Sequence, residues 1–418
     1  MRNHHPLFLL SVPLLLLSAT GCSVFDESLI PEEDPGPMPS ECGAQPAPRP
    51  DVEDSADEDR VLFAIRDIVL DQDDPGSIGY DLDCFDTDSQ EAAQQGETQC
   101  FPPSGGGVPT DGPNGVDNVF GDDFYPLVGA ALSINEIGKL LVDENDPDVE
   151  LTFEEKANQV QASGRGTLLV IIDGWNGTLN DPSMTASIAQ AAYGTPCADD
   201  MGTPPENLVW MPHEGESGTL MIDDGGEMVE APPPAWDGND CWWIREDAFV
   251  TASDEFEISD DQAYVNEGEA VIDIPPRKTI QFFAGPVGVE VKLTGAVSTA
   301  IVSDDFDALT DMTVAGRWAR DDLRSTGENL GVCQFCSTME TLDNSLLSES
   351  DVRSNPDDDP SPNLECNAIS MGVRFETGVR GTYVDRAEGP VLPNPCENGL
   401  ATPCCEETGD PEPDGGCP

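Results

Sequence analysis

Short apolar runs separated by turn-forming residues dominate the chain from residue 60 onward. Between residues 288 and 293, three apolar side chains alternate with Glu290 and Lys292, a spacing typical of a strand with one buried face. Continuous apolar runs of strand length occur at 61–65, 68–70, 167–172, 270–274, 312–316 and 371–375. Many short strands joined by Gly, Pro and Asp turns predict a mainly β fold, either an antiparallel β-sandwich or a barrel-like body.

Two segments show helical spacing instead. In residues 124–142 the apolar positions recur at steps of three and four, namely Leu127, Ala130, Ile134, Ile137 and Leu141. The second segment begins next to Cys336. The apolar residues that share one face in it are Phe335, Met339, Leu342 and Leu346. We expect one or two helices that pack on the β-rich body, with an interaction helix at 124–142 as the alternative.

The first 21 residues have the layout of a secretory signal. Arg2 is followed by an apolar stretch over 6–17 and by the small residues 18–21. The apolar stretch is roughly half of the ~20 residues that a membrane-spanning helix needs. We therefore expect residues 1–21 to be a signal peptide.

The residues Ala19-Thr20-Gly21-Cys22 resemble the lipobox of bacterial lipoproteins. The resemblance implies that the Cys22 thiol carries a diacylglyceryl group and becomes the new N-terminus. Ser23, rather than Asp, implies sorting to the outer membrane. Ordinary signal-peptidase cleavage, which Ala19 and Gly21 also permit, is the alternative.

Composition divides the remaining chain into three parts. Residues 22–58 are rich in Pro, Glu, Asp and Ala, a composition typical of a flexible tether. Residues 59–385 contain the apolar runs and form the expected globular body, as one unit or as two (59–160 and 161–385). Residues 386–418 form a tail rich in Cys, Pro and Gly.

The chain has 13 cysteines, and lipidation of Cys22 leaves an even number for disulfides in an exported protein. Cys84 with Cys100, and Cys197 with Cys241, flank loop-rich stretches that disulfides would close. The tail contains four further cysteines, which we expect to form disulfides with one another or with more distant cysteines: Cys396, Cys404, Cys405 and Cys417.

The motif Cys333-Gln334-Phe335-Cys336 precedes a helical pattern. A helix N-terminus lowers the pKa of a thiol, so a redox pair is one interpretation. Structural disulfides, with Cys336 bonded to Cys366, are a second interpretation, and a zinc site is a third.

Acidic side chains number 82 against 18 basic ones, giving a net charge of −64. This charge excludes a basic nucleic-acid binder, because it repels phosphate. No Lys or Arg occurs from residue 67 to residue 138, and none occurs from residue 166 to residue 244. The excess predicts either a hydrated, self-repelling surface or sites for a hard cation such as calcium.

Two short segments have the oxygen-rich composition that calcium prefers. Residues 81–88 offer four carboxylates, from Asp81, Asp83, Asp86 and Asp88. Residues 111–118 offer two carboxylates and two amides on a glycine-containing loop, from Asp111, Asn114, Asp117 and Asn118. Neither segment matches an EF-hand loop, although both distantly resemble Asp-rich calcium loops of extracellular proteins.

No catalytic residue can be named from the sequence. His213 is the one histidine outside the signal region, which excludes multi-histidine zinc sites. A glycosidase needs only two carboxylates, so a carboxylate-based polysaccharide hydrolase is an alternative. Four tryptophans in a loop-rich stretch could stack on sugar rings or pack in the core: Trp210, Trp236, Trp242 and Trp243.

The acidic tether, residues 79–83, residues 111–118 and the strand-rich later half resemble secreted bacterial lipoproteins of unassigned function. This resemblance implies kinship and no particular activity. The sequence predicts a lipid-anchored envelope protein without an evident catalytic site. We expect it to bind extracellular material, with carbohydrate held through calcium as one form. The alternatives are the hydrolase and a passive structural surface protein.

Overall fold

The computed structural model describes most of the region after residue 42. The described residues are 42–53, 60–70, 77–85, 100, 111–121, 125, 141–143, 146, 148–199, 201–213, 216–284, 287–329, 343–344, 349–358 and 364–389. All of them belong to one compact unit, which spans residues 37–418.

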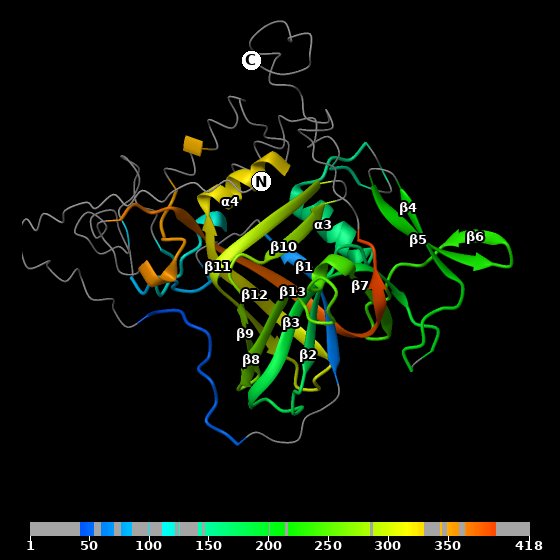
Figure 1. The fold of residues 1–418 in the computed structure, drawn as a ribbon, viewed down its shortest axis with the longest axis horizontal. Helices are drawn as coiled ribbons and strands as arrows, with labels where there is room; N and C mark the ends of the chain where they lie inside the picture. Colours follow the sequence, from blue (N-terminus) through cyan, green and yellow to red (C-terminus); the bar gives the residue numbers. More distant parts are fainter. Residues whose placement is uncertain are drawn as a thin grey trace, which may run out of the picture. The chain divides into compact units, whose positions relative to one another are not determined.

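Eight strands form a closed antiparallel ring in the order β1-β2-β3-β8-β9-β11-β12-β13, and the pairing of β13 with β1 closes it (Figure 1). The strands of this ring are β1 (Val61–Val69), β2 (Leu168–Asp173), β3 (Asp181–Pro196), β8 (Ile258–Asn266), β9 (Glu269–Ile274), β11 (Val287–Val302), β12 (Ala308–Ala319) and β13 (Ala368–Ala387). The predicted mainly β, barrel-like fold is therefore confirmed. Each apolar run that was predicted as a strand overlaps β1, β2, β9, β11, β12 or β13.

The interior of the ring is filled by apolar side chains from all eight strands. Its largest fully buried members include Phe63, Trp318 and Phe375. Alternation along the strands sends every second residue inward, as for Val291 and Leu293 of β11, while Glu290 and Lys292 are half-buried on the outer face. An eight-stranded ring is about wide enough to be filled in this way by its own side chains.

Further strands extend or flank the ring. β7 (Asp240–Arg245) pairs with β3 and with the end of β13, and β10 (Thr279–Ala284) pairs with the start of β11. A separate three-stranded antiparallel sheet contains β4 (Leu208–His213), β5 (Glu216–Asp224) and β6 (Glu227–Glu230). Figure 1 shows this small sheet projecting beside the ring. β7 covers an apolar outer face of β1–β3, so the strands there are buried on both sides.

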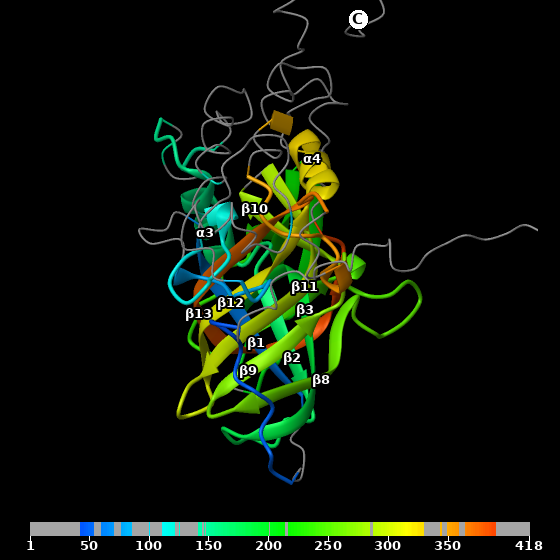
Figure 2. The ribbon, with the colours of Figure 1, turned by 90° about the vertical axis from the view of Figure 1, so that its left-hand side faces the viewer.

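Two α-helices lie at one end of the strands, α3 (Phe153–Ala162) and α4 (Arg320–Asn329) (Figure 2). A capping box starts α3, because Thr152 accepts from the Glu155 amide and Glu155 accepts from the Thr152 amide. Short 3-10 turns, η5 (Glu246–Ala248) and η6 (Pro356–Asp358), complete the described elements. Most of the predicted helices at 124–142 and after Cys336 lie outside the described residues. Among the described residues of these segments, Tyr125 and residues 343–344 are helical. Val142 instead forms a β-bridge with Glu150.

Three disulfides brace the described part of the chain, and they correct two predicted pairings. Cys197 bonds to Cys241 as predicted. Cys84 bonds to Cys42 instead of Cys100, and Cys100 bonds to Cys366, which excludes a Cys336–Cys366 bond. The reason is spatial, since the fold brings residues 100 and 366 together although 266 positions separate them. The remaining cysteines of the predicted set lie outside the described residues: Cys333, Cys336, Cys396, Cys404, Cys405 and Cys417, as does Cys22.

Residues 42–50, which composition assigned to the tether, lie against the ring as a strap. The Tyr264 hydroxyl donates to the Ala47 carbonyl at 2.6 Å, and the Arg49 guanidinium donates to the carbonyls of Pro182 and Gln262. The Cys42–Cys84 disulfide fixes the start of the strap. The disulfides point to an extracytoplasmic protein. Among the residues that the structure describes, no helix is long and apolar enough to cross a membrane.

Candidate metal centre

Two loops cross the outer wall of the ring beside β11, β12 and β13. Residues 77–85 and 111–121 join through an antiparallel bridge between Tyr80 and Asp117, in which the Asp117 amide donates to the Tyr80 carbonyl at 3.0 Å. The Tyr80 hydroxyl shares a hydrogen bond with the Thr299 hydroxyl on β11. Arg317 of β12 donates to the Leu82 carbonyl. These contacts attach the first loop to two neighbouring strands.

Asn118 and two glycines fix the loops to β13. The Asn118 side-chain amide donates to the carbonyls of Ile78 and Gly372, at 2.9 and 3.1 Å, and its oxygen accepts from the Gly372 amide at 2.8 Å. Gly79 has φ +132°, a conformation that side chains disfavour. A Cβ atom on Gly372 would lie 2.2 Å from the Ile78 carbonyl oxygen. The loop can therefore lie directly on the strand only because position 372 has no side chain.

We predict that Gly372→Ala displaces the 77–85 loop. The clash should lower the free energy of unfolding by about 1–3 kcal/mol and weaken any cation binding at the loop. Gly378→Ala in the same strand is a matched control, because its Cβ would meet Ile65 and Leu309 of the ring instead. Chemical denaturation and a calcium titration of both variants would check this. Equal calcium affinities in the two variants would contradict it.

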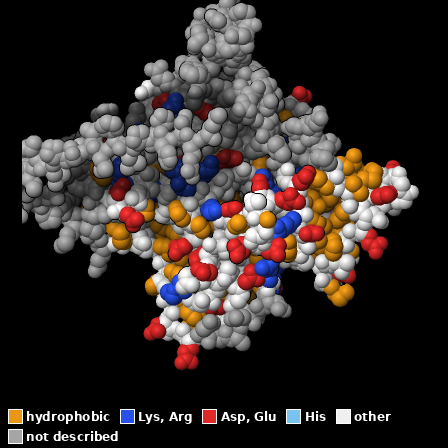
Figure 3. All heavy atoms as spheres, viewed as in Figure 1, with side chains coloured by type: hydrophobic (Ala, Val, Ile, Leu, Met, Phe, Trp, Pro, Cys, Tyr) orange, Lys and Arg blue, Asp and Glu red, His pale blue; other side chains and the backbone are white. Residues whose placement is uncertain are grey.

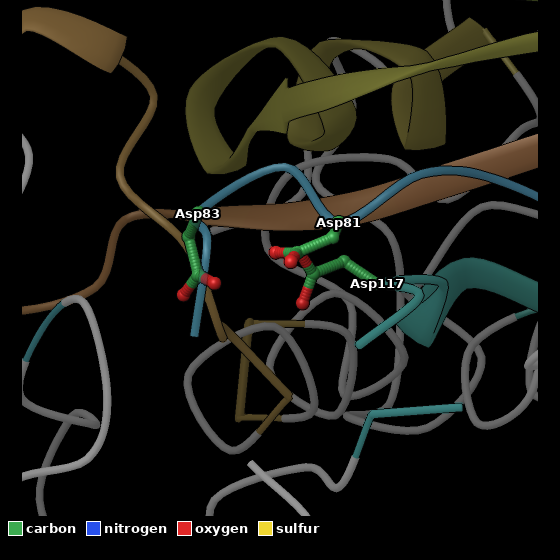
Figure 4. A group of neighbouring side chains, drawn as sticks. All are labelled: Asp81, Asp83 and Asp117. Atoms are coloured by element: carbon green, nitrogen blue, oxygen red, sulfur yellow. The ribbon is translucent and has the colours of Figure 1, made fainter. Parts of the chain in front are cut away.

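Asp81, Asp83 and Asp117 form a buried carboxylate cluster where the two loops meet. One carboxylate oxygen from each lies within 4.8 Å of those of the other two, and the side chains are 2%, 8% and 3% exposed. Figure 4 shows the carboxylates of Asp81 and Asp117 pointing toward each other, with Asp83 beside them on the same loop as Asp81. The structure thus joins the two segments that the sequence analysis treated as separate candidate sites.

Backbone amides orient each carboxylate of the cluster. Asp81 accepts from the amides of Gly43 and Cys84, both at 2.6 Å, so it also binds the strap. Asp83 accepts from the Phe85 amide at 2.8 Å. Asp117 accepts from the Leu82 amide at 2.7 Å. Such turns hold the carboxylates in fixed positions at little conformational cost.

A fourth buried carboxylate, Asp351, belongs to the same electrostatic group. One of its oxygens accepts from the Ser370 amide at 2.8 Å, while the other is buried without a hydrogen-bond partner. The Asp351 carbonyl oxygen lies 3.2 Å from Cys100 Sγ, which places this residue beside the Cys100–Cys366 disulfide. Sequence reasoning did not find Asp351, because it is a lone acid outside both acidic segments.

Burial shifts the protonation of these groups. It raises the pKa of Asp83 and of Asp117 well above the ordinary carboxyl range, and neighbouring carboxyls, including Asp111 and Asp351, add to the shift. Burial also raises the pKa of Asp351 to about 7, with a further contribution from Asp111. Several carboxylates held together out of water repel one another, and a bound cation relieves that repulsion.

The spacing of the cluster suits a hard divalent cation. Calcium takes oxygen ligands at about 2.3–2.6 Å, so two of its ligands are at most about 5 Å apart. The three oxygens that lie within 4.8 Å of one another fit around one such ion. Carboxylate oxygen is also the ligand type that calcium and magnesium prefer over nitrogen or sulfur.

The other residues that were predicted as calcium ligands lie outside the group of three carboxylates. Asp111 is half-buried and close enough to affect the pKa of the cluster. Asn118 holds the loops to β13, so the structure gives it a structural role. Asn114 is exposed in a turn, where its carbonyl accepts from the Ala44 amide. Asp86 and Asp88 lie outside the described residues.

The tryptophans do not form an exposed platform, which corrects the sugar-stacking interpretation for two of them. Trp242 and Trp243 are buried in β7, where alternate side chains pack against two separate apolar clusters. Trp210 stacks on Tyr193 with ring centroids 4.9 Å apart. Trp236 is half-buried, and its indole N–H donates to the Ala162 carbonyl at 3.1 Å.

The tryptophans are also distant from the carboxylates along β13. Asn118 binds Gly372, whereas Trp242 pairs with Tyr383 farther along the same strand. Eleven residues of a strand span up to about 36 Å. The carboxylate cluster and the tryptophans of β7 therefore meet β13 at different positions along the strand.

An open groove of about 710 Å³ lies on the outer side of β9 and β11. Its described lining residues include no aromatic side chain and combine apolar groups with two acids, a guanidinium, an amide and two hydroxyls. They are Asp273, Ile274, Pro276, Arg277, Thr294, Gly295, Ala296, Val297, Ala319, Ser354, Asn355, Pro356 and Asp357. This lining does not by itself identify a hydrolytic pair.

Comparison with known proteins gave no match: no family model, no curated protein and no solved structure is similar to this chain at a significant level. The assignment of a role therefore depends on the geometry described above.

Proposed function

We propose that this chain is an exported envelope protein, anchored by lipid at Cys22, whose β-rich body carries a structural calcium ion. The observation that supports it is the group of three buried carboxylates, from Asp81, Asp83 and Asp117, within 4.8 Å of one another. Asp351, whose charge acts on Asp83 and Asp117, adds a buried oxygen without a hydrogen-bond partner. A buried polar atom without a partner is costly, and a cation nearby would offset that cost.

The ion would join three parts of the chain that are distant in sequence. Asp81 and Asp83 come from one loop, Asp117 from the other, and Asp81 also accepts from Gly43 of the strap. Because the cluster is buried, the ion would act on stability rather than meet a ligand from solvent. Calcium is favoured over magnesium, which demands near-ideal octahedral geometry and keeps several of its waters.

Thermal unfolding of the oxidised protein in calcium, magnesium or EDTA, at one ionic strength, tests this proposal. An ion that binds only the folded state stabilises it by about 2.7 kcal/mol at a hundredfold excess over its Kd. We expect a rise in Tm with calcium that magnesium does not match. Equal Tm values in calcium and EDTA would overturn the calcium site.

The Cys42–Cys84 disulfide should increase calcium affinity. It fixes the strap and the loop on both sides of the cluster, since Gly43 binds Asp81 and Cys84 follows Asp83. Replacing Cys42 and Cys84 with Ser should weaken calcium binding by about tenfold or more, because a preorganised site costs less to order. A calcium titration checks this.

Removing the Cys197–Cys241 disulfide is the matched control for that experiment. The two disulfides close loops of similar length, 42 and 44 residues. Both variants should lose stability, whereas only the first should lose calcium affinity. An equal loss of affinity in both would show that the Cys42–Cys84 bond has no specific effect on the site.

The anchor and its location remain part of the proposal. The lipobox-like residues Ala19 to Cys22 and the extracytoplasmic disulfides support it. Cys22→Ser should release the protein from membrane fractions, and mass spectrometry should find a diacylglyceryl-cysteine N-terminus on the parent. An unmodified N-terminus or cleavage elsewhere would overturn the anchor.

We also propose that the body binds extracellular material, with polysaccharide as one class. The acidic groove beside β9 and β11 is the place where a hydroxyl-rich ligand would find hydrogen-bond partners, and Asp273 and Asn355 are among those it offers. A glycan array probed with the oxidised protein tests this. Asp273→Ala with Asn355→Ala should abolish a positive signal, and an unchanged signal would move the ligand away from the groove.

A further inference from the structure

The small sheet β4–β5–β6 has one face packed on the body and another exposed. Strand register places Trp210 opposite Leu220 on the packed face, where Trp210 stacks on Tyr193 and Leu220 is buried. The neighbouring positions in each strand point the other way, because side chains alternate across a sheet. Val209 therefore shares the opposite face with Met221, its direct partner.

This second face, which we call the Val/Met face, carries Val209, Met211, Met221 and Met228. Val209, Met211 and Met228 are 41%, 42% and 39% exposed. Figure 3 shows hydrophobic side chains gathered over this sheet. Exposed apolar residues that cluster on one face are typical of interaction sites, and methionine adapts readily to different partners.

Acidic residues lie on the Val/Met face. Asp223 lies opposite Met228, and Glu230 lies opposite Met221, on the same face. No Lys or Arg occurs between residues 166 and 244. A second copy of this chain, with a net charge of −64, would be repelled, and so would an anionic membrane. Charge complementarity favours a partner that is both apolar and basic.

The edge of the sheet offers a second recognition element. β6 is the outer strand, since the order is β4-β5-β6, and all four of its residues are exposed. The two-residue turn at Gly225-Gly226 makes Asp224 and Glu227 the first hydrogen-bonded pair, so the amides of Met228 and Glu230 point away from β5. An extended segment can pair with such an edge by strand addition.

We propose that the Val/Met face and the β6 edge bind an extended, cationic segment of another protein, in which Lys or Arg alternates with apolar residues. The added strand would pair with β6 and place its apolar side chains on the Val/Met face beside Met228. Its basic side chains would then lie on the other face of β6, where Glu227 is exposed. This inference does not depend on the calcium site, because none of the residues that it uses belongs to the carboxylate cluster.

Fluorescence anisotropy with synthetic peptides tests the proposal on the full oxidised chain. The probe is a ten-residue peptide that alternates Lys and Val. We expect saturable binding that persists at raised salt. A Glu–Val peptide should not bind. A version of the Lys–Val peptide with N-methyl groups on alternate amides should bind at least tenfold more weakly, because it cannot pair with β6.

Variants separate the Val/Met face from general attraction to an acidic protein. Val209→Ser, Met211→Ser and Met228→Ser together should weaken binding at least tenfold. Ile301→Ser with Leu364→Ser is the matched control, because those two side chains are similarly exposed elsewhere, and it should leave binding unchanged. Equal affinities for both variants, or binding that disappears at raised salt, would overturn the proposal. The parent protein could also bind phosphatidylcholine vesicles while the triple variant does not. That result would assign the Val/Met face to a membrane and would overturn the proposal as well.

Discussion

In EDTA, the protein is expected to lose stability as the pH rises from about 4 to about 7, and calcium is expected to reverse that trend. Asp83, Asp117 and Asp351 have raised pKa values in the folded state, so they hold protons that the unfolded chain releases near pH 4. Where the folded state binds more protons, the free energy of unfolding falls with rising pH. The stability that these bound protons contribute is fully present below about pH 4 and is lost as the pH rises through the folded-state pKa values.

The size of this effect is large for one site. The shift for Asp351, from 3.8 to about 7, corresponds to a loss on the order of 4 kcal/mol. Calcium takes the place of the protons, so in its presence ionisation strengthens binding and stability should rise over the same interval. Urea denaturation at several pH values, in calcium and in EDTA, measures both slopes.

The net charge of the whole chain also changes with pH, so a variant is needed as a reference. Asp351→Asn removes one of the titrating groups and should flatten the EDTA curve between pH 5 and pH 7. If the calcium and EDTA curves of the parent have the same slope, the carboxylate cluster does not bind the ion.

Asp117→Asn is expected to change stability in opposite directions in EDTA and in calcium. The side-chain oxygen of Asn can still accept from the Leu82 amide, which donates to Asp117 at 2.7 Å in the parent. In EDTA at neutral pH the variant should be more stable by about 1–3 kcal/mol, because a buried carboxylate no longer repels its neighbours. In calcium it should be less stable than the parent, since it lacks one anionic ligand.

Asp311→Asn provides the control for that substitution. Asp311 is an exposed residue of β12 whose φ of 49° suits Asn, and it has no place in the cluster. Its replacement should change stability by less than about 0.5 kcal/mol in either condition. If Asp117→Asn behaves like Asp311→Asn, the cluster has no special electrostatic role.

The strands of the ring could be predicted from local patterns, but its closure could not. Apolar runs such as 61–65 and 371–375 identify β1 and β13 from their own residues. The pairing of Leu62 with Gly381 joins residues more than 300 positions apart, and no local pattern encodes it. The helices α3 and α4 were missed because their sequences are mostly polar and only a narrow stripe of each is buried.

The prediction of disulfide pairing was wrong where it relied on proximity in the sequence. Cys84 and Cys100 flank one loop, yet each bonds to a cysteine that is distant in sequence, because the folded chain brings those partners closer. The Cys197–Cys241 prediction succeeded because β7 pairs directly with the end of β3, which places the two residues side by side.

The residues of the candidate site could be predicted from the sequence, but their assembly into one cluster could not. Asp81, Asp83 and Asp117 were in the two acidic segments, but only the Tyr80–Asp117 bridge shows that these segments make one cluster. Burial of Trp242 and Trp243 was not predictable from their loop-like surroundings, since it depends on β7 packing against the ring.

Calorimetric titration of the oxidised, EDTA-treated protein with calcium is the most direct test of the central claim, the calcium site at Asp81, Asp83 and Asp117. It should be made at physiological ionic strength, where diffuse attraction of cations to the acidic surface is screened. We predict one saturable site per chain in this region, lost in Asp117→Asn and kept in Asp311→Asn. Weak, unsaturable heat that is the same in all three proteins would contradict the claim and assign the carboxylates to surface hydration alone.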